Sequence, residues 1–427
     1  MRSDAALDYL YSLGMFGIKL GLDNVRGLLE RLGDPHTRYP IIHVAGTNGK
    51  GSVCAFLGQI YTQGGYRVGI YTSPHLEQFN ERIRIGSEFI STSEVASLTT
   101  EIRAVAHDIQ PTFFEFTTAM ALLYFARQKV DLVVLEVGMG GRLDATNVVD
   151  PVLSIITPIA YDHAAYLGDS LCAIAAEKGG IIRSGVPLVL GVQTPEVDSC
   201  LQAIATPQQA PCYRYGVDYR VERVNGTVDG VSNLDIATPQ RSWCGLTPGL
   251  RGQHQGENLA IALMAIEVMG KRGLNVEPTQ VRAAVVQTSW PGRLEWIGSA
   301  SATPGKVLLD GAHNYAGLIA LQHYLAVCDV ESVHWVCGFK RDKDAPELFP
   351  LLRDYVKNVY TVPVPVEDPW EPSDLARIGQ SVGMEAQAFS EVERALTQAL
   401  KNCQPREIVL VAGSLFLIAE ARRVLAN

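Results

Sequence analysis

The feature that most constrains the fold is a run of apolar residues that leads directly into a glycine-rich turn. Residues 41–45 read Ile-Ile-His-Val-Ala and are followed at 46–52 by Gly-Thr-Asn-Gly-Lys-Gly-Ser. From Val53 to Tyr61, apolar residues recur at the i, i+3, i+4, i+7, i+8 spacing of one buried helix face. Strand, glycine turn and helix in this order are typical of a site where backbone N–H groups and a helix N-terminus hold a polyphosphate.

This turn differs at two positions from the usual phosphate-loop pattern G-x-x-x-x-G-K-[ST]. Val44 stands where the first glycine belongs, and Gly51 stands where Ser or Thr belongs. Lys50 would bring a positive charge to the outer phosphates, and Ser52 would offer a hydroxyl to a magnesium ion. A tight strand-to-helix turn with an incidental lysine explains the same residues, so the decision depends on the rest of the chain.

The bulk properties describe a globular protein with more than one domain. The chain has 427 residues, of which 47% are hydrophobic and 19% charged, and this length exceeds what one core usually holds. Its net charge of −9 argues against a nucleic-acid surface. The N-terminus lacks the pattern of a signal peptide, and no apolar run approaches the roughly 18 residues of a membrane helix. We therefore expect a cytoplasmic protein whose eight scattered cysteines are reduced.

Polar residues follow several of the expected strands. The strands and the residues after them are 67–72 with Ser73, 131–135 with Glu136, and 152–157 with His163. Ligands of doubly wound α/β sheets bind at the carboxyl ends of the strands, so we expect these side chains to meet Ser52 at one edge. Three glycines just after Glu136 favour close approach of the backbone to a ligand. A solvated glutamate and a structural histidine are the alternatives at Glu136 and His163.

Three other segments carry more limited predictions. Lys178 lies in an apolar stretch and is either a lysine whose charged tip reaches water or one whose pKa is lowered by burial. Strict alternation over 212–224 predicts an antiparallel strand with one solvated face, in a peripheral insertion. The glycine-interrupted segment 16–22 predicts a loop that is either plain or lies over a ligand.

A domain boundary is expected at Trp290-Pro291-Gly292, because Pro-Gly interrupts both helices and strands. Alternating strands and helices restart after it, and strand 306–309 leads into a polar cluster that begins at Asp310. The sequence thus predicts an α/β protein of two domains. Residues 1–290 would form a doubly wound, mostly parallel sheet of the phosphate-loop type with a short N-terminal helical segment. Residues 291–427 would form a smaller, Rossmann-like α/β domain.

Taken together, these motifs resemble the folylpolyglutamate synthase and dihydrofolate synthase branch of the Mur ligase superfamily over nearly the whole chain. The stretches that carry the resemblance are 46–52, 72–76, 135–147, 161–163, 177–178, 291–293, 310–314 and 413–416. The long match around Glu136 is highly specific, whereas the phosphate turn alone indicates only the superfamily. Gly179, Ala164-Ala165 and Tyr315 depart from the usual pattern and leave loop rigidity and details near the pterin open.

The resemblance implies a role for each matching residue. The residues that would bind ATP are Asn48, Gly49, Lys50, Gly51, Ser52, Asn258, Arg293 and Asp310. The expected metal ligands are Ser52, Ser73, Glu136 and His163. The segments that would line the pterin pocket are Thr112, Phe113, Phe114 and Glu115, and Leu143, Asp144 and Ala145. The catalytic group would comprise Lys50, Glu136, His163 and Lys178, of which Lys178 would carry a carbamate.

The resemblance also implies an ATP-dependent amide ligase. ATP would convert a carboxylate into an acyl phosphate, with Mg²⁺ and Lys50 neutralising charge on the transferred group. The amino group of L-glutamate would then displace phosphate. The acid would be dihydropteroate, a (tetrahydro)folate through its γ-carboxylate, or both. Both activities in one enzyme are expected, and a single-activity folylpolyglutamate synthase is the alternative. We expect a monomer without nucleic-acid or membrane partners, in which Mn²⁺ substitutes for Mg²⁺ because histidine on magnesium is unusual.

Two rival interpretations are less consistent with the sequence. A cell-wall Mur ligase would carry an extra domain before the phosphate turn, whereas only 45 residues precede Gly46, fewer than a typical domain has. A nucleotide-gated binding protein without ligase activity would not need Glu136, His163 and Lys178.

Overall fold

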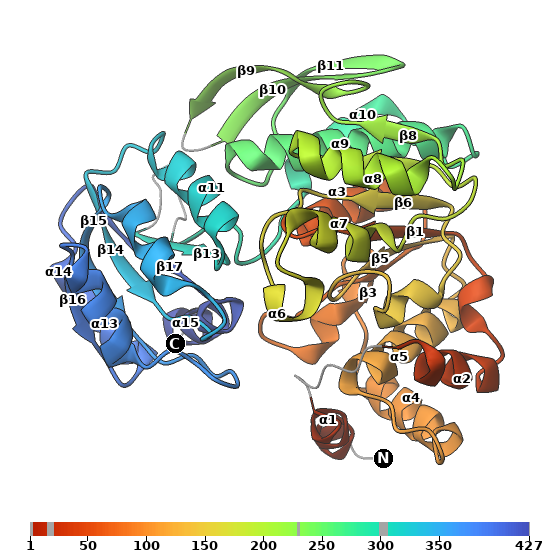
Figure 1. Ribbon diagram of the computed structural model, residues 1–427, viewed down its shortest axis with the longest axis horizontal. Coiled ribbons are helices and arrows are strands. Elements are labelled where there is room, and N and C mark those ends of the chain that lie inside the picture. Colours follow the sequence, from red (N-terminus) through yellow and green to blue (C-terminus); the bar gives the residue numbers. More distant parts are fainter. Residues whose placement is uncertain (1–2, 15–20, 229–230, 299–305, 427) are drawn as a thin grey trace. The chain divides into compact units, whose positions relative to one another are not determined.

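The computed structural model describes residues 3–14, 21–228, 231–298 and 306–426 (Figure 1). The chain forms two compact units. The first comprises Met1–Arg223, Asp235–Leu246 and Glu257–Thr288, and the second comprises Val224–Leu234, Thr247–Gly256 and Ser289–Asn427. The predicted division into 1–290 and 291–427 stays a prediction. Most of the loop expected at 16–22 lies outside the described residues. In the described part of the chain, no helix is long and apolar enough to cross a membrane.

The first unit is built on an eight-stranded, mostly parallel sheet, as predicted (Figure 1). In spatial order its strands are β4 (Glu88–Phe89), β3 (Ile83–Ile85), β2 (Val68–Tyr71), β5 (Leu132–Glu136), β1 (Ile41–Ala45), β6 (Leu153–Ile156), β7 (Leu188–Leu190) and β8 (Cys212–Arg214). All neighbours from β2 to β8 are parallel, and β3 and β4 add an antiparallel edge.

The position of β1 explains why the glycine turn matters. β1 lies between β5 and β6, and the chain leaves it through helix α3 (Lys50–Gln63) to reach β2, on the far side of β5. The carboxyl end of β1 is therefore the point where the strand order reverses, which is the usual ligand position of such sheets. The register places Val44 beside Glu136, so the acidic residue comes next to the start of the turn.

Helices cover both faces of this sheet. On one face, α2 (Asp23–Arg31), α4 (Thr92–Val105) and α5 (Phe113–Arg127) pack with Ile41, Tyr71 and Leu135 in one buried cluster. On another part of the sheet, α7 (Leu171–Gly179) and α8 (Pro195–Ala205) pack with residues of β6 and β7. The remaining helices of the unit are α1 (Ser3–Ser12), α6 (Ala164–Leu167), α9 (Gln253–Gly270) and α10 (Pro278–Gln287), of which α9 begins in the second unit.

The single antiparallel strand predicted over 212–224 is wrong. β8 runs parallel to β7, and the backbone then turns, with the Asp218 N–H donating to the Arg214 carbonyl at 2.9 Å. Tyr219 is fully buried whereas Val217 is 59% exposed, so the two do not share a face. Gly216, with φ of 82°, permits the turn.

A small three-stranded sheet does follow, in the order β11 (Arg241–Leu246), β10 (Val231–Thr238), β9 (Arg220–Val228). Because only two residues join β10 to β11, that pair is antiparallel. The predicted peripheral insertion is therefore present, although it begins later than expected.

The expectation that every cysteine is reduced is also wrong. Cys172 of α7 and Cys200 of α8 form a disulfide with their Cα atoms 5.9 Å apart. The packing of α7 on α8 brings together two residues that are 28 positions apart, and the spacing of cysteines in the sequence does not reveal such a contact.

The second unit has its own α/β sheet. Its strands, in spatial order, are β12 (Glu295–Ile297), β13 (Val307–Asp310), β17 (Glu407–Ala412), β14 (Ser332–Cys337), β15 (Val356–Thr361) and β16 (Glu385–Ala388). Only β12 is antiparallel to its neighbour. The helices are α11 (Tyr315–Leu325), α12 (Ala345–Leu348), α13 (Pro372–Ser381), α14 (Val392–Asn402) and α15 (Leu415–Ala426). The predicted alternation of strands and helices is present in this region, and the strand predicted at 306–309 corresponds to β13. The short elements β12, β16 and α12 were not predicted.

Candidate active site

The glycine turn joins β1 to α3 in a conformation that depends on its glycines. Gly46 and Gly49 have φ of 141° and 89°, and a Cβ at Gly46 would lie 1.8 Å from the Thr157 hydroxyl. Gly49 is the N-cap of α3 and offers no capping side chain. The first N–H groups of a helix lack partners within the helix, so those at 50–52 are oriented to receive an anion.

Two lysine side chains converge on this turn. The Lys50 ammonium donates to the carbonyl of Gly46 at 3.1 Å, and the Lys178 ammonium, from the end of α7, donates to the same oxygen at 2.9 Å. Lys178 is only 4% exposed. Burial, reinforced by the charge of Lys50, lowers the pKa of Lys178 to about 7. The structure therefore gathers two cations where the sequence predicts a polyphosphate, and it supports the buried alternative for Lys178.

Glu136 lies at the same edge, at the end of β5. It is 4% exposed, and its Oε2 accepts a hydrogen bond from the backbone N–H of Ser73 at 3.0 Å. Ser73 follows β2 and precedes Pro74 through a cis peptide bond. The strand order β2, β5, β1 thus brings Ser73, Glu136 and the glycine turn into neighbouring positions.

His163 lies on the segment after β6, with a left-handed backbone at φ of 52°. Its backbone N–H donates to Oδ1 of Asp162 at 3.0 Å, and its imidazole Nε2 lies 3.9 Å from the same oxygen. In the described residues, no three His, Cys, Asp or Glu side chains gather as a metal site. Hydroxyls of Ser52 and Ser73 with the single carboxylate of Glu136 fit magnesium, which keeps waters and phosphate oxygens as its other ligands.

Asn258 of α9 is brought to the glycine turn. A Cβ at Gly49 would lie 2.3 Å from Oδ1 of this buried side chain, so Gly49 has no room for any other residue. Asn258 is more than 200 positions away from Gly49 in the sequence, and the fold brings the two together. Its role at ATP stays a prediction.

The residues predicted to line a pterin pocket perform structural tasks as well. Thr112 and Glu115 cap α5 reciprocally: the Glu115 N–H donates to the Thr112 hydroxyl and the Thr112 N–H donates to the Glu115 carboxylate. Phe113 is buried, and the ring of Phe114 lies against Gly138, where a Cβ would approach it within 2.4 Å. The start of α5 therefore lies beside the loop that follows Glu136.

Asp144 holds that same loop in shape. One carboxylate oxygen accepts from the Met139 N–H at 2.8 Å, and the other accepts from the backbone N–H and hydroxyl of Thr146 at 2.9 and 2.6 Å. Burial raises the pKa of Asp144, although these hydrogen bonds oppose the shift. Of its predicted neighbours, Leu143 is half-buried and Ala145 is buried.

Arg293 and Asp310 lie in the second unit. Asp310 ends β13, and its carboxylate accepts from the backbone N–H groups of Leu294 and Ala312, both at 2.9 Å. The Arg293 guanidinium lies against Gly311, where a Cβ would be 1.8 Å from Nη1. Burial raises the pKa of Asp310, and the charge of Arg293 opposes this shift. The two predicted ATP contacts of this unit are therefore neighbours.

Two side chains near the site were not predicted from the sequence. Asp162 lies in the stretch 161–163, where the sequence assigns it no role, yet its charge opposes the downward shift of the pKa of Lys178. Arg82, at the end of the short helix η2 (Phe79–Arg82), is 5% exposed and lies over the ring of Phe113. Arg82 follows a short helix rather than a strand, so a search for polar residues after strands does not find it.

Comparison with known proteins gives two family matches. Residues 44–266 match the model of the Mur ligase middle domain, and residues 292–415 match the model of the Mur ligase glutamate ligase domain. A relative from Bacillus subtilis, named dihydrofolate synthase/folylpolyglutamate synthase, is 32% identical over 98% of this chain and 98% of its own length. A relative from Haloferax volcanii, named "Probable bifunctional folylpolyglutamate synthase/dihydropteroate synthase", is 33% identical, and this chain spans about half of its length.

The solved structures include a similar protein. Folylpolyglutamate synthase of Mycobacterium tuberculosis, complexed with ADP and AMPPCP, superposes with a TM-score of 0.91 at 31% identity. The match covers 100% of this chain and 99% of that one.

Proposed function

The chain belongs to the Mur ligase family of ATP-dependent ligases, and we propose that it joins L-glutamate to dihydropteroate and to the γ-carboxylate of (tetrahydro)folate. The observation that carries the proposal is the convergence of the Lys50 and Lys178 ammonium groups on the Gly46 carbonyl. The Lys50 ammonium and the uncapped N-terminus of α3 both favour an anion such as a triphosphate at this turn.

The reaction needs ATP because a carboxylate anion repels nucleophiles. Transfer of the γ-phosphoryl group gives an acyl phosphate and ADP, and the amine of glutamate then attacks the acyl carbon and releases phosphate. Lys50 and the N–H groups at the start of α3 would stabilise the charge on the transferred group. Asn258 would contact the nucleotide beside Gly49, and Arg293 and Asp310, which are neighbours in the second unit, are the other two residues proposed to bind ATP.

A magnesium ion would be held by Ser52, Ser73 and Glu136, with His163 as the fourth predicted ligand, and would neutralise phosphate charge. Mn²⁺ would be accepted as well. We also propose that Lys178 forms a carbamate with carbon dioxide. Its pKa of about 7 supports this, because a neutral amine is required and about half of the side chains are neutral at pH 7.

The acid substrate is inferred from the names of the relatives and from the residues at the start of α5 and around Asp144. Phe114 is half-buried and offers apolar surface to a pterin beside Gly138, in the loop that the Asp144 carboxylate holds in shape. The bifunctional name of the Bacillus subtilis relative, which matches this chain over nearly its full length, supports both activities.

Phosphate release measured with ATP, L-glutamate and one acid at a time tests the proposal. We expect release with dihydropteroate and, separately, with tetrahydrofolate, and in each case only when all three substrates are present. Release with tetrahydrofolate alone among the acids would reduce the function to folylpolyglutamate synthase. No release with either acid would favour a nucleotide-gated binding protein.

A further inference from the structure

Arg82 is a buried cation that the proposed chemistry does not yet use. Its side chain is 5% exposed, and burial lowers the pKa of its guanidinium. Arginine is seldom buried to this extent unless an anion accompanies it, because removing an ionised group from water is costly. The partners of Arg82 therefore need to be identified.

The partners within the chain are neutral. Nε donates to Nδ1 of His75 at 2.7 Å, and the guanidinium carbon lies 5.2 Å from the centre of the Phe113 ring. Because Nδ1 accepts this hydrogen bond, it carries no proton, and the imidazole is the neutral tautomer. The hydroxyl of buried Tyr71 is a further favourable neighbour. Over the described part of the chain, no carboxylate forms an ion pair with Arg82.

The position of Arg82 is as informative as its partners. Phe113 belongs to the segment proposed to line the pterin pocket, and His75 is two residues after Ser73, whose backbone N–H donates to Glu136. Glu136 also attracts Arg82 electrostatically without pairing with it. The guanidinium thus lies between the pterin segment and the residues proposed to hold the metal. A pteroate or folate whose pterin lay at the first segment, and whose carboxylate reached the proposed metal ligands, would bring that carboxylate to the guanidinium.

We propose that Arg82 binds the carboxylate of the acid substrate and holds it beside Ser73 and Glu136 for phosphoryl transfer. This inference rests on the proposed function. The planar guanidinium has five N–H donors; Nε–H is used on His75 and the Tyr71 hydroxyl engages the group as well, so donors remain for the carboxylate. Contact through a planar guanidinium fixes orientation as well as position. The acid is a benzoate in dihydropteroate and an alkyl carboxylate in folate, and Arg82 would bind either one.

A purely structural role is the competing explanation. Arg82 would then only support the Phe113 ring and the loop at His75, and its loss would weaken binding of any ligand in the pocket. The two explanations differ for a ligand that lacks the negative charge. Dihydropteroate and its carboxamide have the same pterin and ring, so comparing them isolates the contribution of the carboxylate.

Calorimetric titration with the acid and the carboxamide, at a saturating non-hydrolysable ATP analogue, tests the proposal. Wild-type protein is expected to bind the acid about tenfold to a hundredfold more tightly than the carboxamide. Arg82→Gln should remove this preference while leaving affinity for the carboxamide within about threefold of the wild-type value. Arg84→Gln, which removes a partly buried arginine two residues away, is the matched control and should keep the preference.

The outcomes separate the possibilities. Equal loss of affinity for both ligands in Arg82→Gln, or an unchanged preference for the acid, would overturn the inference. If Arg82→Gln does not fold, Arg82→Lys is the substitute variant. It keeps the positive charge but not the planar guanidinium, and it should show a reduced preference for the acid over the carboxamide. Wild-type protein that binds the two ligands equally would overturn the inference without any variant.

Kinetics extend the test to folates and separate it from the proposed function. In Arg82→Gln, KM should rise about tenfold or more for dihydropteroate and for tetrahydrofolate, with little change in KM for ATP. A rise for only one acid would restrict the contact to that acid. Absence of acid-dependent phosphate release in wild-type protein would refute the proposed function itself, whereas release combined with an unchanged acid preference in the variant refutes only the role of Arg82.

Discussion

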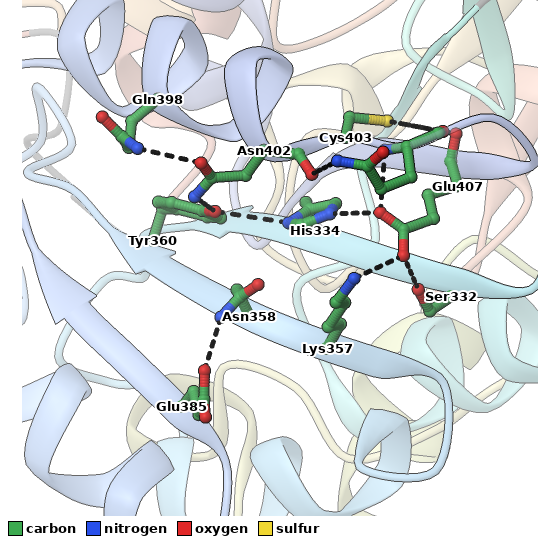
Figure 2. Close-up of polar contacts among 11 residues, drawn as sticks. Ser332, His334, Lys357, Asn358, Tyr360, Glu385, Gln398, Asn402, Cys403 and Glu407 are labelled. Atoms are coloured by element: carbon green, nitrogen blue, oxygen red, sulfur yellow. Dashed lines mark hydrogen bonds and ion pairs between the residues drawn. The ribbon is translucent and has the colours of Figure 1, made fainter.

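The sheets of the two units each carry a cluster of polar groups, but at opposite ends of their strands. In the second unit the cluster lies where β14, β15 and β17 begin, and Figure 2 shows its contacts. Glu407 accepts hydrogen bonds from Lys357 at 2.7 Å, His334 at 2.9 Å and Ser332 at 3.0 Å. Tyr360 lies against the other side of His334.

In the first unit the cluster lies where strands end. The cations Lys50, Lys178 and Arg82 contact backbone carbonyls, a neutral imidazole and an aromatic ring. In the second cluster a carboxylate, that of Glu407, accepts from Lys357 and His334. In the first cluster the groups that accept from Lys50, Lys178 and Arg82 are neutral. The difference teaches that a network completed by a protein carboxylate stabilises the fold. A group of basic side chains without such a carboxylate can instead bind an anionic ligand.

The pKa values of Glu407 and Lys178 differ in the same way as the contacts of the two clusters. Burial alone would raise the pKa of Glu407, yet hydrogen bonds from Lys357, the Gln404 N–H, His334 and Ser332 lower it to about 2. The pKa of Lys178 is lowered to about 7 because burial and Lys50 outweigh the nearby acids. The charged form is therefore favoured at Glu407 and disfavoured at Lys178.

The largest expected effect comes from removing a cation of the first cluster. Lys50→Ala should lower kcat by about a thousandfold or more, because it removes the positive charge that would stabilise the transferred phosphoryl group. Lys357→Ala is the matched control, since Lys357 belongs to the completed network and should leave kcat unchanged. Steady-state phosphate release checks both variants, and near-normal turnover in Lys50→Ala would remove the assignment of the phosphate turn.

A smaller loss is expected at Lys178. Lys178→Met should lower kcat about a hundredfold if the carbamate positions the metal and its ligands. In wild-type protein supplied with ¹³C-bicarbonate, the carbamate signal should rise as pH increases from 6 to 8, because the amine loses its proton near pH 7. A ¹³C NMR series across this range checks the trend, and an unmodified amine at saturating bicarbonate would contradict it.

Breaking the hydrogen-bond network around Glu407 should lower the free energy of unfolding and leave kcat unchanged. Glu407→Gln removes the charged acceptor of three side-chain hydrogen bonds and should lower the free energy of unfolding by about 2 kcal/mol. The kcat of folded protein should stay within about twofold of wild type. Urea unfolding and phosphate release measure the two quantities. A large loss of kcat with normal stability would show that this cluster takes part in catalysis.

The smallest effect concerns acid stability. The folded-state pKa of Glu407 lies below the ordinary value of 4.5, so its stabilisation is complete above that value and is lost as pH falls toward about 2. The unfolding free energy of wild type should therefore decrease between pH 5 and pH 2 by about 1 kcal/mol more than that of Glu407→Gln. Urea titrations at several pH values check this difference, and parallel curves for the two proteins would refute it.

Most elements and part of the site could be predicted because their signals are local. Residues 41–52 contain the strand, the glycines and the lysine of the turn in one short stretch, and Glu136 directly follows a fully apolar strand. The prediction over 212–224 failed because alternation of residue types continues across a turn that Gly216 permits. The roles given to the site residues stay predictions, although Lys50, Lys178, Asn258 and Gly49 do meet at one turn.

The sequence by itself determined the α/β class, the glycine turn after β1 and the polar residues at strand ends, since hydrophobic periodicity and glycine positions act over a few residues. Only the tertiary structure decided which distant side chains share a charge environment. Arg82 lies over Phe113, 31 positions later, and His334 binds Glu407, 73 positions later. Such pairs depend on strand order and helix packing. These decide which charged side chains are buried beside an acid and which beside neutral groups, and no local sequence pattern predicts this.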